Sequence, residues 1–517
     1  MYDDEPLSEP LNADLLEFDE TASNSRLRSC LFTVISLVVI ASLLGSSVVA
    51  FFIVRDRATQ TMSAAAATMV ATAALSLELE EAATDAPPTA APATIVAAVP
   101  TSAPVSDKPA SAVPGINRIA IVNGEGQIET LSPTGEDRRS VTDDDDNIFF
   151  QFPTWSPDGS RIAVIGSRFT GGGVYVFEDA ETELPAVQSE VYFSADETPF
   201  YLYWSPDSSH LAFLANHERN SMGLNVIAGD GATDSRLLAT GSPMYWDWTD
   251  DGRRLLIHSG QGRARDTLAL IDLQGAAQAD NLATPGYFQA PGVASGDRYL
   301  AFAEQESGGL STLVIVDTQT GEHRPYEQVG SLALSWSPTE DRLAFTNGSI
   351  EGHPFWGALR LLDVSTGETR VLSRQTVLAF FWSPDGRSIA FITIGRDDED
   401  SIHASTAPKT RRVGRLTSQP AMPVQQPGQN YLTLSIVDVD TGEGLRLLDF
   451  EPTATYLTQF LPFFDQYALS HRIWSPDSNA LVLPVREEGV NMVVVVPARG
   501  GRPHRLAEGD IAFWSQQ

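Results

Sequence analysis

Residues capable of acid–base, metal or nucleophilic chemistry are few in this sequence, and they do not form a known catalytic pattern. The eight histidines contain no H-E-x-x-H or H-x-H cluster of the kind that holds zinc. The single cysteine, Cys30, excludes an internal disulfide and a cysteine-based zinc site. A G-x-S-x-G nucleophile elbow is also absent from the sequence. We therefore predict no catalytic residue, no metal site and no cofactor, and we expect that the protein is not an enzyme.

Two acidic stretches have the composition of calcium ligands but not the arrangement. Asp143-Asp144-Asp145-Asp146 is a bare run of carboxylates, whereas calcium binds several oxygens held in a fixed geometry. Residues 438–443 read Asp-Val-Asp-Thr-Gly-Glu and resemble part of a calcium loop, but Thr-Gly-Glu recurs elsewhere without the two aspartates. We interpret the first stretch as a solvated loop and the second as a turn. His471 could face a central channel, but we expect a buried core histidine.

One hairpin phrase recurs along the sequence and sets its organisation. Its best copy is Trp382-Ser383-Pro384-Asp385-Gly386, flanked by aromatic and β-branched residues that favour strands. Serine, proline, aspartate and glycine stand at the positions that each favours in a type I turn. Seven of the nine tryptophans lie in copies of this phrase, so the phrase is a repeat. Copies start at Trp155, Trp204, Trp248, Trp336 and Trp474, a degenerate copy lies at Ala294–Asp297, and a fragment lies at Phe513-Trp514-Ser515.

The spacing of the copies predicts the blades of a β-propeller. Trp155 and Trp204 are 49 residues apart, and Trp204 and Trp248 are 44 apart. After each turn we expect a second strand, a third strand leading into a Thr-Gly-Glu turn, as in residues 313–322, and a short fourth strand. A four-stranded unit of about 40–50 residues is typical of propeller blades. One such sheet cannot bury both of its faces, so neighbouring blades must supply the core.

The two ends of the repeat region predict that the ring closes. Residues 118–131 contain a second and a third strand with no first strand before them, whereas the fragment at Trp514 is a first strand alone. The C-terminal strand should therefore complete the blade that the N-terminal strands begin, which leaves only short, protected edges. The predicted fold class is all-β, an eight-bladed β-propeller. A seven-bladed ring is the alternative, if the degenerate unit is absorbed elsewhere.

The repeat also resembles a known family. Its W-S-P-D-G…I-A-F…D…T-G-E unit is similar to the repeat of TolB-type propellers, and to the propeller beside the hydrolase domain of prolyl-oligopeptidase-like enzymes. The resemblance covers roughly residues 116–517. It implies a propeller and, because known TolB proteins are periplasmic and bind protein partners, a binding role outside the cytoplasm. This sequence lacks the separate α/β domain that precedes the propeller in TolB proteins, and it has an apolar segment instead.

The residues before the repeat region predict a membrane anchor. Residues 1–25 are polar and acidic, which indicates a disordered cytoplasmic tail. Within residues 26–57, residues 31–54 form an uncharged, mostly apolar run that could span a bilayer as one helix. Residues 58–115 are rich in Ala, Pro and Thr and indicate a disordered spacer. Two arginines flank each end of the apolar run, so charge does not set its orientation. Because such stalks suit exported domains, we expect a single-pass membrane protein with the propeller outside the cytoplasm.

The composition argues against one class of partner. The 517 residues are 42% hydrophobic, which is enough for a large core, and their formal net charge is −33. Binding to nucleic acid depends on lysine and arginine at the phosphates. A chain this acidic is therefore expected to bind no nucleic acid.

Two insertions interrupt the repeat and predict the functional face. The interval from Trp382 to Trp474 is 92 residues, yet it contains the strands of one blade. One insertion, residues 395–429, lies between a second and a third strand, and the other, residues 455–467, lies between a fourth strand and the next first strand. Topology places both on the face opposite the Ser-Pro-Asp-Gly turns. We expect the turn face to be structural and a protein or peptide partner to bind the insertion face.

The second insertion is dense in aromatic residues, which dominate the cores of protein interfaces. The alternative is that it folds over its own blade or plugs the central channel. Aromatic residues at the starts of other first strands extend the same rim, although most of them are expected to pack between blades. The predicted partner-binding residues are Tyr456, Phe460, Phe463, Phe464 and Tyr467 in the insertion, with Tyr201, Tyr245 and Trp246 on the rim.

Taken from the sequence, the function is that of a membrane-anchored extracytoplasmic β-propeller acting as a protein-binding or scaffold module. The alternative is a propeller enzyme, a hydrolase or a lyase, with a site built from scattered residues in the central channel.

Overall fold

The computed structural model describes residues 117–142, 147–178, 188–218, 221–260, 267–273, 280–286, 289–305, 311–348, 355–394 and 432–517. Internal contacts divide the chain into Met1–Ser106 and Asp107–Gln517, and the first unit lies outside the described residues. The predicted tail, membrane anchor and spacer therefore lie outside them, as do Asp143–Asp146 and the insertion 395–429. None of the helices in the described ranges has both the length and the apolar character needed to cross a membrane.

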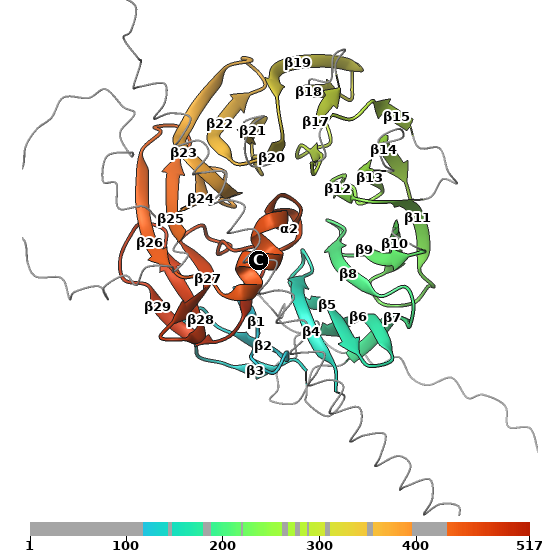
Figure 1. Cartoon of the computed structure of the whole chain (residues 1–517), viewed down its shortest axis with the longest axis vertical. Coiled ribbons are helices and arrows are strands. Elements are labelled where there is room, and N and C mark those ends of the chain that lie inside the picture. The colour runs from blue at the N-terminus through green and yellow to red at the C-terminus, as the bar shows by residue number, and fades with distance from the viewer. Residues whose placement is uncertain are drawn as a thin grey trace, which may run out of the picture. The chain divides into compact units, whose positions relative to one another are not determined.

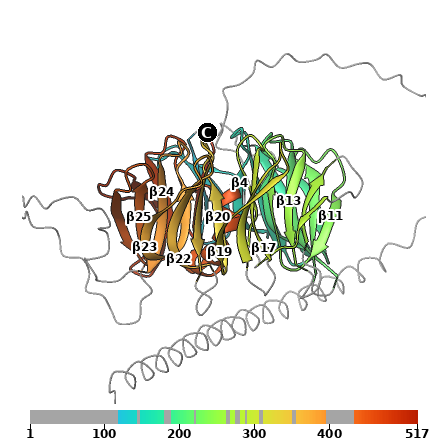
Figure 2. The same cartoon turned by 90° about the horizontal axis from the view of Figure 1, so that it is seen from above.

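Antiparallel four-stranded sheets stand around a central axis as the blades of a ring (Figure 1). In most of them the strands pair in chain order, from a strand beside the axis to one at the rim. Figure 2, a view of the ring from the side, shows the strands running between its two faces. These sheets confirm the predicted all-β propeller. They consist of β4 (Phe149–Trp155), β5 (Arg161–Arg168), β6 (Gly171–Glu178) and β7 (Gln188–Ser194); β8 (Pro199–Trp204), β9 (His210–His217), β10 (Ser221–Ala228) and β11 (Arg236–Gly241); β12 (Met244–Trp248), β13 (Arg254–Ser259), β14 (Thr267–Asp272) and β15 (Asp280–Ala283); β16 (Gly292–Val293), β17 (Tyr299–Gln305), β18 (Ser311–Asp317) and β19 (Glu322–Val329).

Two further sheets complete the circle between β19 and the C-terminal strand. The first has seven strands, because the long strand β23 (Thr369–Trp382) pairs with β22 along its first half and with β24 along its second half. The second sheet has three strands, and an isolated bridge between Trp474 and Leu481 extends it toward the axis. Their remaining strands are β20 (Leu332–Trp336), β21 (Arg342–Asn347), β22 (Gly357–Asp363), β24 (Ser388–Ile394), β25 (Leu432–Asp438) and β26 (Gly444–Phe450), then β27 (Ala480–Glu487), β28 (Val490–Pro497) and β29 (His504–Glu508).

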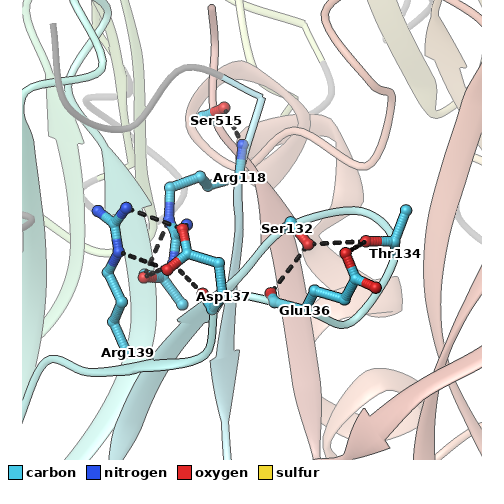
Figure 3. Close-up of polar contacts among 8 residues, drawn as sticks. Arg118, Ser132, Thr134, Glu136, Asp137, Arg139 and Ser515 are labelled. Atoms are coloured by element: carbon cyan, nitrogen blue, oxygen red, sulfur yellow. Dashed lines mark hydrogen bonds and ion pairs between the residues drawn. The ribbon is translucent and has the colours of Figure 1, made fainter. Parts of the chain in front are cut away.

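The predicted closure of the ring by the C-terminal strand is confirmed. Strand β30 (Ile511–Trp514) pairs antiparallel with β1 (Ile119–Val122), so that Ile119 lies opposite Trp514. The sheet continues outward through β2 (Ile128–Leu131) and β3 (Arg139–Ser140). Beside this pairing the buried guanidinium of Arg118 donates to Asp137 at 2.6 Å, and the backbone N–H of Arg118 donates to the Ser515 hydroxyl (Figure 3). The two ends of the propeller are thus held by backbone and side-chain bonds together.

The turn chemistry of the repeat explains why its residues recur. In the best copy the Ser383 hydroxyl donates to Asp385 at 2.6 Å, and Gly386 has a φ of 70°, a left-handed conformation that glycine adopts without strain. The tryptophans join neighbouring blades. The indole N–H of Trp382 donates to the carbonyl of Ser335, and that of Trp474 donates to the carbonyl of Phe381. Each of these donors reaches the residue just before the repeat tryptophan of the preceding blade.

Replacing Trp514 with alanine should lower the free energy of unfolding by about 3–5 kcal/mol, as large-to-small changes in protein cores do. The side chain is 2% exposed and lies in the strand that closes the ring. Chemical denaturation of the described domain measures the change, and Leu445→Ala, at an exposed position of β26, is the control. An unfolding free energy equal to that of the control would contradict the role assigned to the closing strand.

Candidate functional site

The second insertion forms a helical plug in the centre of the ring. Residues 456–470, called the plug from here on, comprise η2 (Tyr456–Phe460), η3 (Leu461–Phe463) and α2 (Phe464–Ser470). Figure 1 shows α2 at the axis, surrounded by the blades. Aromatic residues at 456, 460, 464 and 467 recur at the spacing of one helix face. This spacing was a signal for a helix that the interpretation as a binding loop did not use.

Most of the aromatic residues predicted to bind a partner are buried inside the propeller. Phe460 is fully buried, and its ring lies 5.1 Å from that of Tyr456 and 5.6 Å from that of Phe513 in the closing strand. Phe464 packs at 5.3 Å from Phe380 of β23. In this conformation they offer no surface to a partner, and the alternative of a plugged channel describes the segment. The correction applies to Tyr456, Phe460, Phe464, Tyr467, Tyr201 and Trp246, all of them buried.

Two of the eight predicted residues keep some accessible surface. Phe463 is 46% exposed, and Tyr245 at the start of β12 is half-buried. Burial raises the pKa of the Tyr245 hydroxyl. Binding of a partner by these two side chains stays a prediction.

The plug is tied to the inner strands by a network centred on Gln466. The side-chain amide of Gln466 accepts from the backbone N–H of Trp246 and donates to its carbonyl, both at 2.9 Å. The Tyr201 hydroxyl donates to the backbone carbonyl of Gln466 at 2.9 Å and lies 2.8 Å from the hydroxyl of Ser470. Burial is the main cause that raises the pKa of Tyr201, so the phenol stays protonated. Side chain and backbone of one helix therefore bind β8 and β12 at once.

His471 extends this network to β4. Its Nε2 lies 3.2 Å from the carbonyl oxygen of Phe152, which can only accept, so Nε2 carries the proton and Nδ1 accepts from the Ser470 hydroxyl. Phe152 has a φ of 51° within a bulge of β4, and its ring stacks on Tyr467 at 4.8 Å. Burial lowers the pKa of His471 to about 3. The expected buried core histidine is therefore confirmed, and its low pKa keeps the ring neutral.

A cavity of about 350 Å³ remains on the other side of the plug, at the mouth of the channel. We call it the channel pocket. Its rim consists of the Ser-Pro turns of the repeat, including Pro206, Pro338 and Pro384, and its floor includes Leu469 and Arg472. The turn face, which was expected to be structural, therefore contains a hollow among its described residues.

Ionisable groups on the wall of the channel pocket have perturbed pKa values. Asp247 is 6% exposed, and burial raises its pKa to about 7. Its two oxygens accept from the backbone N–H groups of Val293 at 2.8 Å and Trp248 at 2.9 Å. Burial, followed by the charge of Asp247, raises the pKa of Tyr203. A carboxyl group poised near neutrality beside a phenol is a feature of sites that handle protons, and also of buried structural pairs.

The described residues contain no group of three or more His, Cys, Asp or Glu side chains that could hold a metal ion. A site in the central channel was an alternative in the sequence analysis, but its residues were not foreseen, because Asp247, Tyr203 and Arg472 lie far apart along the chain. Tyr203 and Asp247 each stand one residue before a repeat tryptophan, where the chain reaches the channel mouth. That position was the available signal.

Comparisons with known proteins bear on the fold. No family model and no curated protein matches the sequence. Among solved structures, TolB from Acinetobacter baumannii is 17% identical, with a TM-score of 0.32 over 49% of this chain and 62% of that one. This chain thus spans less than two thirds of that TolB. An oligogalacturonate lyase in complex with manganese is 14% identical, with a TM-score of 0.42 over 70% of this chain and 85% of that one.

A puromycin-hydrolyzing peptidase from Mycobacterium tuberculosis is 15% identical, with a TM-score of 0.37 over 57% of this chain and 50% of that one. The resemblance to TolB-type and prolyl-oligopeptidase-like propellers, first noted in the repeat, is thus found among solved structures as well. At these identities and TM-scores the likeness concerns the fold alone, and it carries no argument about ligand or activity.

Truncating Phe464 and its neighbour Phe463 should have opposite consequences. Phe464→Ala removes a side chain that is 1% exposed, and it should lower the unfolding free energy by about 3–5 kcal/mol. Phe463→Ala removes one that is 46% exposed, and it should change that energy by no more than about 0.5 kcal/mol. Urea denaturation of both variants measures the difference. Equal losses would contradict the position of the plug.

Neutralising Asp465 should change how stability depends on pH. Burial raises the pKa of Asp465 to about 6, from 3.8. The folded state therefore favours the protonated form, so stability is full below the unfolded pKa and is lost as pH rises through about 6. The unfolding free energy of Asp465→Asn, relative to that of wild type, should rise by about 3 kcal/mol between about pH 4 and pH 7. Above about pH 7 this difference should stay constant.

Denaturation at a series of pH values measures this difference, and Asp477→Asn is the control. The Ser475 hydroxyl donates to Asp477 at 2.6 Å and lowers its pKa, so that control should lose stability relative to wild type as pH rises through the acidic range. A pH-independent difference for Asp465→Asn would show that the carboxyl is solvated.

Proposed function

We propose that this chain is a membrane-anchored, extracytoplasmic β-propeller that binds a protein partner on the insertion face. Support for the anchor comes from the apolar run at 31–54, and support for an exported propeller comes from the spacer at 58–115. The membrane anchor and the location outside the cytoplasm are parts of the proposal. The choice of the insertion face as the partner-binding face rests on the exposed apolar side chains that lie there.

We also propose that the ring has eight blades. The long strand β23 would be shared by two of them, as the fourth strand of one and the first strand of the next. The sheet β27–β28–β29 would be completed at the axis by residues around Trp474, which bridge to Leu481. The sheet closed by β30 is then the remaining blade.

Exposed apolar side chains gather on the insertion face. Strands β4 and β8 run from this face toward the repeat turns, so Phe149 and Phe200 near their starts lie on it, 61% and 37% exposed. Phe169, in the turn between β5 and β6, lies on the same face and is 85% exposed. Ile394 at the end of β24 and Val490 at the start of β28 belong there too. With Phe463 of the plug they provide the apolar anchors that protein interfaces use.

A second candidate function is favoured by Asp247. A carboxyl group with a pKa near 7 in a pocket could act as a general acid or base in a propeller hydrolase or lyase. This alternative places the working site in the channel pocket, on the turn face, rather than on the insertion face. The two candidates therefore predict different sensitive residues.

A photo-crosslinking residue placed on the insertion face of the full chain tests the proposal in intact cells. Substituted at Phe169 or Phe463, it should yield a discrete crosslinked protein. The same residue at Leu237, which is 44% exposed on the outer strand β11, is the matched control. The double variant Phe169→Ala/Phe463→Ala should lower partner affinity by about 2 kcal/mol or more without loss of fold stability.

Protease added to the same intact cells should release the propeller and spare the tail. Crosslinking that is equal at Phe169 and Leu237 would contradict the partner face. Protection of the propeller until lysis would contradict the location outside the cytoplasm. Loss of a catalysed reaction in Asp247→Asn with unchanged crosslinking would favour the second candidate instead.

A further inference from the structure

The channel pocket contains a cation that the described residues do not neutralise. Arg472 lies two residues after the plug, and it lines the pocket together with Tyr203 and Gln516. Its Nη1 donates to the backbone carbonyl of Gln516 at 2.9 Å, which is a neutral acceptor. Among the described residues, no carboxylate forms an ion pair with it. By contrast, the buried guanidinium of Arg118, beside the closing strand, has a carboxylate, that of Asp137, at 2.6 Å.

An unneutralised guanidinium in a pocket costs free energy, because burial removes water without supplying a counter-charge. Burial accordingly lowers the pKa of Arg472. A guanidinium has five N–H donors in a planar fork, and the bond to Gln516 uses one nitrogen. The unused edge has the geometry that suits the two oxygens of a carboxylate.

The carboxylates of the same pocket are already engaged by protein groups. Both oxygens of Asp247 accept backbone N–H groups, and Asp250 accepts from the Gly296 N–H and from the Ser295 hydroxyl at 3.2 Å. Asp247 therefore cannot turn toward Arg472 without breaking those bonds, and Oδ2 of Asp250 is likewise engaged. Their charge also disfavours a dianionic ligand such as phosphate in this pocket. The same repulsion is smaller for an anion of single charge, which is also the charge that one guanidinium can neutralise.

Apolar residues also line the pocket. Trp336, Trp382, Trp474 and Leu469 are among its lining residues, beside polar ones such as Ser335 and Ser337. Its volume of about 350 Å³ lies at the lower end of the range for small-ligand sites, about 300–1,000 Å³. Such a cavity has room for one short apolar group beside the anion.

We propose that the channel pocket binds a monocarboxylate with an apolar body, whose carboxylate is held by the guanidinium of Arg472 and whose body lies against the tryptophan wall. A free organic acid and the C-terminal residue of a peptide share this chemistry. The site lies on the turn face and does not depend on the partner surface proposed for the insertion face, so the two can fail separately.

Isothermal titration of the full chain with a matched pair of probes tests the proposal. N-acetyl-phenylalanine carries the carboxylate, and N-acetyl-phenylalaninamide has the same body without the charge. The acid should bind, and the amide should bind at least tenfold more weakly. The tetrapeptide Ala-Ala-Ala-Phe with a free C-terminus, compared with its amide, distinguishes the two sources of carboxylate. Inorganic phosphate is the third arm.

Variants identify the residue responsible. Arg472→Gln should weaken binding of the acid by tenfold or more, and Arg472→Lys should be intermediate, because lysine keeps the charge but lacks the fork. Ala468→Phe narrows the pocket without touching the charge and should also weaken binding. Arg387→Gln is the control, since Arg387 is an exposed arginine of a repeat turn and does not line the pocket.

Melting temperature separates a ligand role from a structural one. Removing an unneutralised charge from the pocket wall should leave the melting temperature of Arg472→Gln unchanged or raised, while binding is lost. A lowered melting temperature with intact binding would overturn the proposal. So would equal binding of acid and amide, tighter binding of phosphate than of the acids, or no binding of either acid.

Discussion

The side-chain amide of Gln466 bonds to the backbone N–H and carbonyl of Trp246 as a neighbouring strand would. The inner strand of each blade has no further strand beside it, yet its polar backbone groups require partners where water is excluded. The plug provides such partners through Gln466 to β12 and through Asp465 to the N–H of Ala290 ahead of β16. In addition, the Thr154 hydroxyl of β4 donates to the backbone carbonyl of Ser470. At these positions the plug takes the place that water would occupy in an open channel.

The plug therefore closes one part of the channel and borders the part that stays open, the channel pocket. The aromatic side of the plug, with Phe460 and Phe464, packs against inner strands and the closing strand. The end of the same segment, at Leu469 and Arg472, forms the floor of the channel pocket. The depth of the pocket is consequently fixed by a helix held from several sides. A ligand there would meet a preformed floor and would not have to order a loop.

The sequence alone was sufficient for the architecture and insufficient for the site, and the reason is the range of the interactions involved. Turn residues such as Ser383 and Gly386 act within one hairpin, so the repeat and its period could be read locally. Ring closure followed because the missing strand at one end matched the extra strand at the other. The plug stood only as the alternative to a binding loop, because aromatic composition is the same in an exposed and a buried segment. The helical spacing of these residues, which distinguishes the two, was not used. The pocket required Asp247 and Arg472 to be placed together across many residues of chain, which no local pattern reports.

The pairing of β1 with β30 also has a mechanical consequence. Any pull transmitted along the chain from residues before 117 reaches the propeller at β1, which lies between β2 and β30 inside its sheet. Such a load acts on two ladders of backbone bonds together, and on the bonds of Arg118 to Ser515 and Asp137 beside them. A domain tethered at this point would resist unfolding under tension, because its first strand cannot detach without breaking its pairing with both neighbours and opening the ring.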